Sequence, residues 1–145
     1  MDILIREIQD TDHSDLVRLW NHDLGSPTLT PDNAAARIQR INSSENYKIA
    51  VAVLDDKVIG CISMAQIMAL EYEVGYLQIN GLVVQADYQH QGVGSKLLHY
   101  AENLASKSGL SYIILNCGFQ RTKAHTFYES KGFDRLSYCF TKAIK

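Results

Sequence analysis

The sequence predicts an α/β protein of the α+β kind, with a mixed, mostly antiparallel twisted sheet and helices on both faces. Apolar runs with strand and helix periodicity follow the order β, α, α, β, β, β, α, β, α, β. A meander of three strands precedes a strand–helix–strand crossover, so antiparallel and parallel neighbours share one sheet. The 145 residues have the length of a single domain, and we assign residues 1–145 to it.

The first part of the chain supplies one strand and two helices. Apolar and polar residues alternate over residues 3–6, which predicts the first strand. Residues 11–15 offer capping side chains for a helix over residues 16–24. A second helix starts at residues 30–32, where an N-cap threonine, a proline and an acidic residue follow one another.

The middle of the chain predicts a three-stranded meander. Residues 47–54 and 58–64 form two strands joined by a short polar turn, and a third strand runs from about residue 73 to residue 84. Gly81 interrupts this third strand, and a glycine within a strand often marks a bulge. A bulge there would separate the strand from the later strand at residues 112–116. The resulting splayed central pair would leave backbone groups free for a ligand.

The last part of the chain predicts a helix behind the third meander strand, then a strand, a helix and a strand. Leucine and alanine recur at helical spacing after Ser95. Residues 112–116 form a buried strand, residues 122–130 a short helix that Lys131-Gly132 closes, and residues 133–142 a final strand.

Between the third meander strand and this helix lies a glycine-containing loop, residues 89–95. The first turn of a helix has free N–H groups and a partial positive charge, and both attract a phosphate. Gly92 and Gly94 let a bulky ligand approach the backbone. A Rossmann loop is excluded because Leu97 stands where its third glycine belongs, and a P-loop because the order Gly-Lys-Ser/Thr is missing.

Composition narrows the class of protein further. The net charge of −2 argues against a general nucleic-acid-binding surface, which would be basic. No apolar run has the length of a membrane-spanning helix. The N-terminus does not have the layout of a signal peptide. Three cysteines, Cys61, Cys117 and Cys139, lie far apart in apolar segments, which favours buried reduced thiols and a cytoplasmic location. The histidines show no metal-ligand spacing, so no metal is expected.

Three segments together resemble the GNAT superfamily of N-acetyltransferases over nearly the full chain. They are Leu82-Val83-Val84, the loop Gln89-x-x-Gly92-x-Gly94, and residues 124–133, which are similar to the family segment A-x-x-F-Y-x-x-x-G-F. Within the superfamily, three segments resemble the aminoalkylphosphonate acetyltransferase group: Gly94-Ser95-Lys96-Leu97-Leu98, Ala124-His125-x-Phe127-Tyr128 and the ending Phe140-Thr141-Lys142.

The resemblance implies acetyl-CoA as the donor and transfer of its acetyl group to a primary amine of a small molecule. It also implies that backbone groups of the third meander strand pair with the pantetheine arm and that loop amides hold the diphosphate. The cofactor-binding residues implied in this way are Leu82, Val83, Val84, Gln89, His90, Gln91, Gly92, Val93, Gly94, Ser95, Asn116, Ala124, Phe127 and Lys131.

Tyr128 is the candidate general acid, because it matches the tyrosine of the family segment. A phenol has a pKa of ~10 and a thiol one of ~8.5, so protonating the departing thiolate is uphill by about 2 kcal/mol. Holding the phenol close to the thiolate can offset this free-energy cost. The alternative is that Tyr128 packs as a core aromatic residue beside Phe127.

The base is less well defined. Many relatives carry a carboxylate late in the third meander strand, where this chain has Gln78, Asn80 and Gly81. Amides cannot act as bases. Glu71 and Glu73 could act through ordered water, with Glu73 preferred, and the alternative is that both are solvated surface acids. Arg121 stands where family members often have asparagine.

Two other functions stay open at this point. One keeps the chemistry but makes the acceptor a protein or peptide amine. The other is a non-catalytic acyl-CoA-binding sensor, which the missing strand carboxylate favours. In each case we expect no nucleic acid or membrane partner, and a homodimer is compatible with the sequence.

Overall fold

The computed structural model describes residues 1–145 and has twelve elements, which divide into two compact units, Met1–Ile114 and Leu115–Lys145. The first unit holds four strands, three α-helices and three short 3₁₀ or π turns. They are β1 (Leu4–Glu7), η1 (Asp10–Asp12), α1 (His13–Arg18), η2 (Leu19–Asp23), α2 (Pro31–Asn42), β2 (Tyr47–Leu54), β3 (Lys57–Ile67), β4 (Tyr76–Val84), η3 (Ala86–Tyr88) and α3 (Val93–Lys107). β5 (Ile113–Leu115) ends at the boundary, and α4 (Thr122–Ser130) lies in the second unit.

The sheet has the strand order β1-β2-β3-β4-β5, and the first three pairings are antiparallel. The Ser111 N–H donates to the Gly75 carbonyl (2.9 Å), and the Leu77 N–H donates to the Tyr112 carbonyl (3.0 Å). Residue numbers rise together in these two pairs, so the chain enters β5 parallel to β4. This confirms the predicted mixed, mostly antiparallel sheet.

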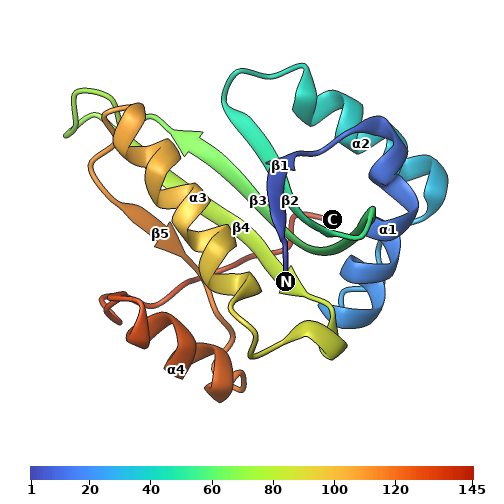
Figure 1. Cartoon of the computed structure of the whole chain (residues 1–145). Helices are drawn as coiled ribbons and strands as arrows, with labels where there is room; N and C mark the ends of the chain where they lie inside the picture. Colours follow the sequence, from blue (N-terminus) through green and yellow to red (C-terminus); the bar gives the residue numbers. More distant parts are fainter. The chain divides into compact units, whose positions relative to one another are not determined.

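Helices cover both faces of the sheet in the first unit, with α3 on one face and α1 and α2 on the other (Figure 1). A Cβ atom on Gly60 of β3 would lie 3.2 Å from the side chains of Leu97 and Val93, so α3 packs directly on the middle of the sheet. The opposite face is an apolar cluster whose members come from the segment after β1, from α1, η2 and α2, and from the central strands. They are Ile8, Leu16, Leu19, Ile38, Ile49, Val51, Val53, Val58, Cys61 and Val83.

The start of α2 follows the signals in the sequence, whereas α1 begins at His13, within the residues expected to cap it, and has no side-chain cap. Thr30 caps α2 by accepting a hydrogen bond from the Asn33 N–H (3.2 Å), while the Asn33 side chain accepts one from the Thr30 N–H (2.8 Å). Pro31 occupies the first helical position, as predicted. α4 covers the predicted residues 122–130, and Gly132 beyond it has a φ of 92°.

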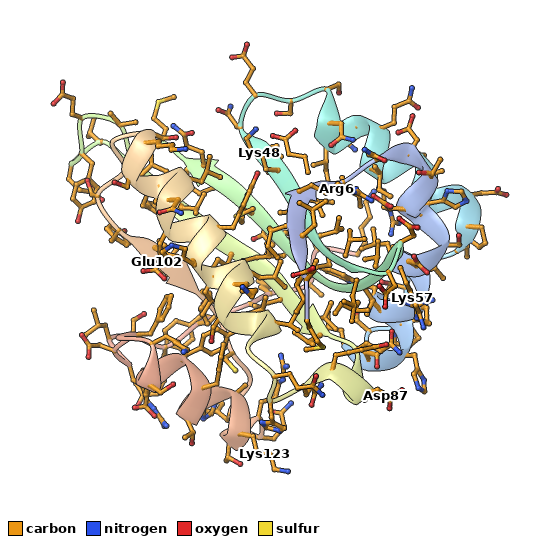
Figure 2. All side chains as sticks on the ribbon, viewed as in Figure 1. Arg6, Lys48, Lys57, Asp87, Glu102 and Lys123 are labelled. Carbon is orange, nitrogen blue, oxygen red and sulfur yellow. The ribbon has the colours of Figure 1, made fainter.

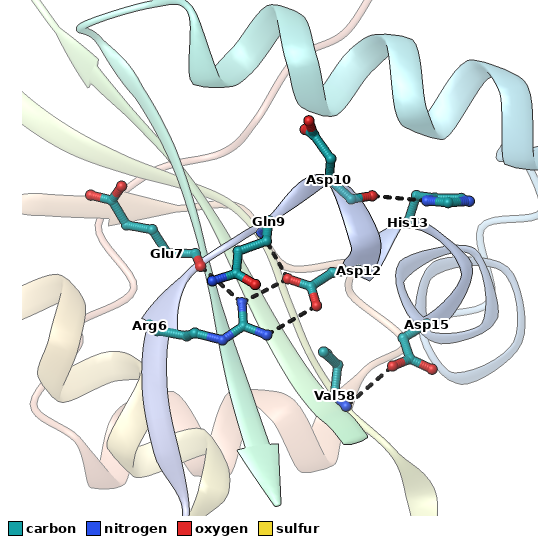
Figure 3. Close-up of polar contacts among 8 residues, drawn as sticks. All are labelled: Arg6, Glu7, Gln9, Asp10, Asp12, His13, Asp15 and Val58. Atoms are coloured by element: carbon teal, nitrogen blue, oxygen red, sulfur yellow. Dashed lines mark hydrogen bonds and ion pairs between the residues drawn. The ribbon is translucent and has the colours of Figure 1, made fainter. Parts of the chain in front are cut away.

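An ion pair joins the first strand to the first helix (Figure 3). The Arg6 guanidinium donates to both carboxylate oxygens of Asp12 (2.7 and 3.0 Å), and the Gln9 N–H donates to Asp12 Oδ2 (2.7 Å). Burial opposes ionisation of Asp12, but these donors hold its pKa below the ordinary value. Figure 2 shows all side chains on the ribbon, among them Glu102, which is exposed on α3.

Several sequence expectations are corrected. β4 begins at Tyr76 and not near residue 73, because Gly75 has a φ of 124° and breaks the strand. The final strand expected over residues 133–142 does not form, although its apolar residues alternate. Cys61 is buried as expected, but Cys117 is half-buried and Cys139 is exposed; all three thiols are free. No helix combines the length and the apolar character needed to cross a membrane.

Candidate active site at the start of helix α3

The start of α3 is an open cluster of backbone donors. Gly92 is its N-cap, has a left-handed backbone (φ 85°), and provides no side-chain cap. The first helical hydrogen bond runs from the Lys96 N–H to the Gly92 carbonyl (3.1 Å), so the amides of Val93, Gly94 and Ser95 have no partner within the helix. A Cβ atom on Gly92 would meet nothing within 4 Å. An anion such as a diphosphate can therefore approach these amides closely.

Two glutamines fix the loop that leads to this helix. The Gln89 side chain donates to the Val84 carbonyl (3.1 Å) and the Gln91 side chain to the Asp87 carbonyl (3.2 Å). His90 between them has a φ of 62°, which is a strained conformation for a residue other than glycine. The sequence predicted that these positions bind the cofactor. The structure shows that both glutamine side chains hold the loop, so its main-chain groups are what a ligand would meet.

β4 carries a bulge beside Gly81, as predicted. Ser63 of β3 pairs with Gly81, but the next residue, Met64, pairs with Ile79, so Asn80 is the extra residue of β4. The predicted bulge is thus one position away from the glycine that signals it.

The bulge divides β4 into a part beside β5 and a part beyond it. Leu77 of β4 bonds to Tyr112, and the two strands run parallel. Two residues further along each strand, Ile79 of β4 therefore lies beside Ile114, the last residue of the first unit. Residues 82–84 lie past that point, where Val83 is buried in the apolar cluster. Their edge away from β3 is therefore suited to an extended, amide-bearing ligand.

The polar side chains on β4 near the bulge are amides. The Gln78 side chain donates to Asn80 Oδ1 (3.0 Å), so the two amides bond to each other. Glu71 and Glu73 lie in the exposed loop between β3 and β4 and not on the strand, since β4 begins only at Tyr76.

Tyr128 lies on α4 in the second unit and is half-buried. Its ring makes edge contacts with Phe127 (centroids 5.3 Å apart) and with Phe133 (5.7 Å). Burial raises the pKa of Tyr128, the Cys117 thiol raises it further, and the positive charge of Arg121 lowers it. The phenol is thus protonated at neutral pH, and its raised pKa increases the energy needed to give up the proton.

The other site residues expected in the second unit differ in exposure. Ala124 and Phe127 are half-buried on α4, while Asn116 and Lys131 are exposed. The Lys131 ammonium lies 5.8 Å from the centroid of the Phe127 ring. His125 Nε2 is 2.7 Å from the Gly118 carbonyl, so this histidine holds the loop before α4.

Sequence reasoning did not predict the contacts of four residues in α1 and η2, two of which, Trp20 and Asp23, contact the backbone of β4 or of the residues after it. Trp20 lies against Gly81, and Arg18 and Asp23 bond to residues that directly follow β4. Asn21, between them, bonds to Leu29. The glycine at position 81 was the one signal for these contacts. No group of three or more metal-ligating side chains occurs in the structure.

Comparison with known proteins places this geometry in a family. Residues 12–133 match the Acetyltransferase (GNAT) family. The chain is 33% identical over 109 residues to the uncharacterized N-acetyltransferase YhdJ of Bacillus subtilis (strain 168), covering 74% of this chain and 76% of that protein. It is 31% identical over 99 residues to the aminoalkylphosphonate N-acetyltransferase of Salmonella typhimurium (strain LT2), covering 68% and 64% of the two chains.

A solved structure shows the same fold over the full length. The crystal structure of a transcriptional regulator from Bacillus halodurans C-125 superposes with a TM-score of 0.91 at 24% identity, covering 99% of this chain and 100% of that one.

Proposed function

The chain belongs to the acetyltransferase (GNAT) family and is an acetyl-CoA-dependent N-acetyltransferase, and from that premise we propose that its acceptor is the primary amine of a small molecule. The proposed binding site for acetyl-CoA is supported by the start of α3, which has no side-chain cap. There, three backbone amides face an open approach at Gly92, beside the end of β4. The diphosphate of the donor binds these amides, and its pantetheine arm runs along residues 82–84.

The reaction needs no covalent enzyme intermediate in this proposal. The neutral amine attacks the thioester carbonyl, the C–N bond forms, and the C–S bond breaks to release the CoA thiolate, while the attacking nitrogen loses its extra proton to solvent. Tyr128 gives its proton to that thiolate. The raised pKa of Tyr128 makes the transfer more uphill than for a free phenol. Tyr128 therefore contributes only if the thiolate forms within hydrogen-bond distance of the phenol.

The acceptor must also lose a proton. An alkyl amine with a pKa of ~10.4 is neutral only about once in 2,500 molecules at pH 7, which costs roughly 4.6 kcal/mol. The Gln78–Asn80 amide pair cannot take that proton. Glu73 is the proposed base and acts through ordered water, since its exposed loop has access to solvent.

A small-molecule acceptor is supported by the name of one relative, the aminoalkylphosphonate N-acetyltransferase. The test is release of free CoA thiol from acetyl-CoA with a panel of primary amines, aminoalkylphosphonates and peptides. We expect turnover with small amines and a rate that rises with pH as the amine deprotonates. Turnover with peptides alone would show that the acceptor is a protein.

The acid is tested separately with the best amine. Tyr128→Phe removes the hydroxyl group and keeps the ring contacts with Phe127 and Phe133. We expect kcat to fall by roughly 10²- to 10⁴-fold with the KM for acetyl-CoA nearly unchanged. Phe133→Leu is the matched control, because it alters the same aromatic group and leaves the hydroxyl group in place. An unchanged kcat in Tyr128→Phe would show that Tyr128 is a packing residue.

A further inference from the structure

The helix at the start of the chain ends in a π turn that faces the end of β4. α1 leads into η2, where the Leu24 N–H donates to the Leu19 carbonyl (2.8 Å), a bond that spans five residues. Such turns are rare and frequently occur at functional sites. Three side chains of η2, those of Trp20, Asn21 and Asp23, contact segments distant in the sequence.

Trp20 contacts the bulge in β4. A Cβ atom on Gly81 would lie 2.4 Å from Trp20 Cη2 and 2.9 Å from Cζ2, distances that real Cβ atoms essentially never show. The indole therefore rests directly on the backbone of Gly81, next to the extra residue Asn80. Glycine at position 81 is thus required by the indole, in addition to its place beside the bulge.

Asp23 and Arg18 hold the other end of the same segment. Asp23 Oδ1 accepts a hydrogen bond from the Ala86 N–H (3.1 Å) at the start of η3. The Arg18 guanidinium donates to the Val58 carbonyl (2.8 Å) and, at 3.4 Å, to the Gln85 side chain. One turn of helix therefore fixes the backbone on both sides of residues 82–84.

Asn21 extends the same turn to the segment between the first two helices. Its side chain accepts from the Leu29 N–H (2.9 Å) and donates to the Leu29 carbonyl (2.6 Å). Leu29 belongs to the segment that joins η2 to α2. η2 thus contacts this segment as well as the residues that follow β4.

We propose that Trp20 and Asp23 are positioning residues for acetyl transfer, which set the backbone of β4 against which the donor arm binds. A bulge bends its strand and leaves one residue unpaired, and a misplacement of 1 Å at a reacting centre costs up to roughly 10²-fold in rate. The indole against Gly81 and the carboxylate at Ala86 hold the backbone on both sides of residues 82–84. This inference rests on the donor placement proposed above.

A double-mutant cycle tests the contact at the bulge. We expect Gly81→Ala to lower kcat/KM for acetyl-CoA by roughly 10- to 100-fold, since the new methyl group moves the strand or the indole. Trp20→Leu is expected to lower it by a smaller factor. In the double variant the smaller leucine makes room for the methyl group, so kcat/KM recovers to the value of Trp20→Leu.

A conservative pair tests the other end. Asp23→Asn keeps an oxygen that can accept from the Ala86 N–H, and we expect kcat/KM for acetyl-CoA to stay within about threefold of wild type. Asp23→Ala removes the acceptor, and kcat/KM falls by roughly tenfold or more. Ile41→Ala is the control for general stability, because Ile41 packs on the same apolar cluster and belongs to α2. It should lower the melting temperature and leave kcat/KM unchanged.

The outcomes separate this inference from the proposed function. If Gly92→Ala raises the KM for acetyl-CoA while the Gly81, Trp20 and Asp23 variants lose only thermal stability, the donor site stands and the positioning role is wrong. If Gly92→Ala leaves the KM unchanged, the donor placement itself is wrong. If the kcat/KM of the double variant stayed as low as that of Gly81→Ala, the positioning role of Trp20 would also be wrong.

Discussion

Gly92 is the residue on which the donor site most directly depends. Its left-handed backbone turns the loop into α3, and its missing side chain leaves the first amides of the helix open. The sequence pattern Gln89-x-x-Gly92-x-Gly94 predicted a helix start with glycines at this place, because such a start is a local feature, and α3 begins there. The same pattern could not show that the Gln89 and Gln91 side chains bond to the loop itself, because their partners depend on the folded loop.

Replacing Gly92 with alanine should affect both stability and donor binding. No atom lies near the added methyl group, but the left-handed backbone costs about 1–2 kcal/mol for a residue with a Cβ. The methyl group also occupies the approach to the amides, so we expect the KM for acetyl-CoA to rise by roughly tenfold. Initial rates and urea unfolding measure the two effects.

The matched control is Gly109→Ala at the opposite end of α3. Gly109 has a φ of 70°, and its nearest outside atom is 3.9 Å from the added Cβ. The loss of stability should be similar and the KM unchanged. An equal rise of the KM in both variants would mean that α3 as a whole had moved.

Cys61 makes stability depend on pH above neutrality. Burial, and to a lesser extent the charge of Asp12, raises the pKa of Cys61 to about 12. An unfolded thiol has a pKa of ~8.5, so the folded state holds the proton more tightly. The stabilisation is fully present below pH ~8.5 and is lost as the pH rises toward the folded pKa. We expect wild type to lose about 2 kcal/mol between pH 7.5 and pH 10 through this group.

Urea unfolding of wild type and Cys61→Ala at both pH values isolates this effect. Alanine does not titrate, so the variant should lose about 2 kcal/mol less than wild type over the same interval. Equal losses in the two proteins would contradict the assignment. Cys139, which is exposed, should react with iodoacetamide in the folded protein while Cys61 does not.

At the scale of elements, the sequence predicted a helix or strand correctly where the residues that determine it are neighbours in the chain. The start of α2 follows from its capping residues and the end of α4 from the glycine beyond it, and both are confirmed. The final strand expected over residues 133–142 was wrong, because alternation shows that a strand could form and does not supply a partner for its hydrogen bonds. The π turn at η2 was not predicted, since a hydrogen bond over five residues has no distinct sequence pattern.

The capping box of α2 allows a test of a local signal. Thr30→Ala removes the oxygen that accepts from the Asn33 N–H, and we expect a loss of about 1 kcal/mol of unfolding free energy. Thermal or urea unfolding measures it. Thr28→Ala is the control, because Thr28 is exposed in the same segment and its side chain makes one long contact, 3.5 Å, with the Ser26 carbonyl. If both variants lost the same amount, the cap would contribute nothing.

At the scale of the whole molecule, the second unit has no core of its own. None of the residues from Leu115 to Lys145 is buried, and every buried apolar residue belongs to the first unit. Chains shorter than ~40 residues usually need disulfides, metals or association to fold. The free cysteines supply no disulfide here. We therefore propose that residues 1–145 fold as one domain.

One domain predicts one cooperative unfolding transition for the full chain. Trp20 fluorescence reports unfolding of the first unit, and tryptic cleavage after Arg121 or Lys123 reports unfolding of the second. The two unfolding transitions should have the same midpoint. Acetyl-CoA at 100 times its Kd should stabilise both by about 2.7 kcal/mol, because a ligand that binds only the folded chain shifts the whole equilibrium. If cleavage in the second unit followed a separate, earlier transition that acetyl-CoA left unchanged, the chain would comprise two independent parts. Tyr128 could not then act on a donor bound at α3.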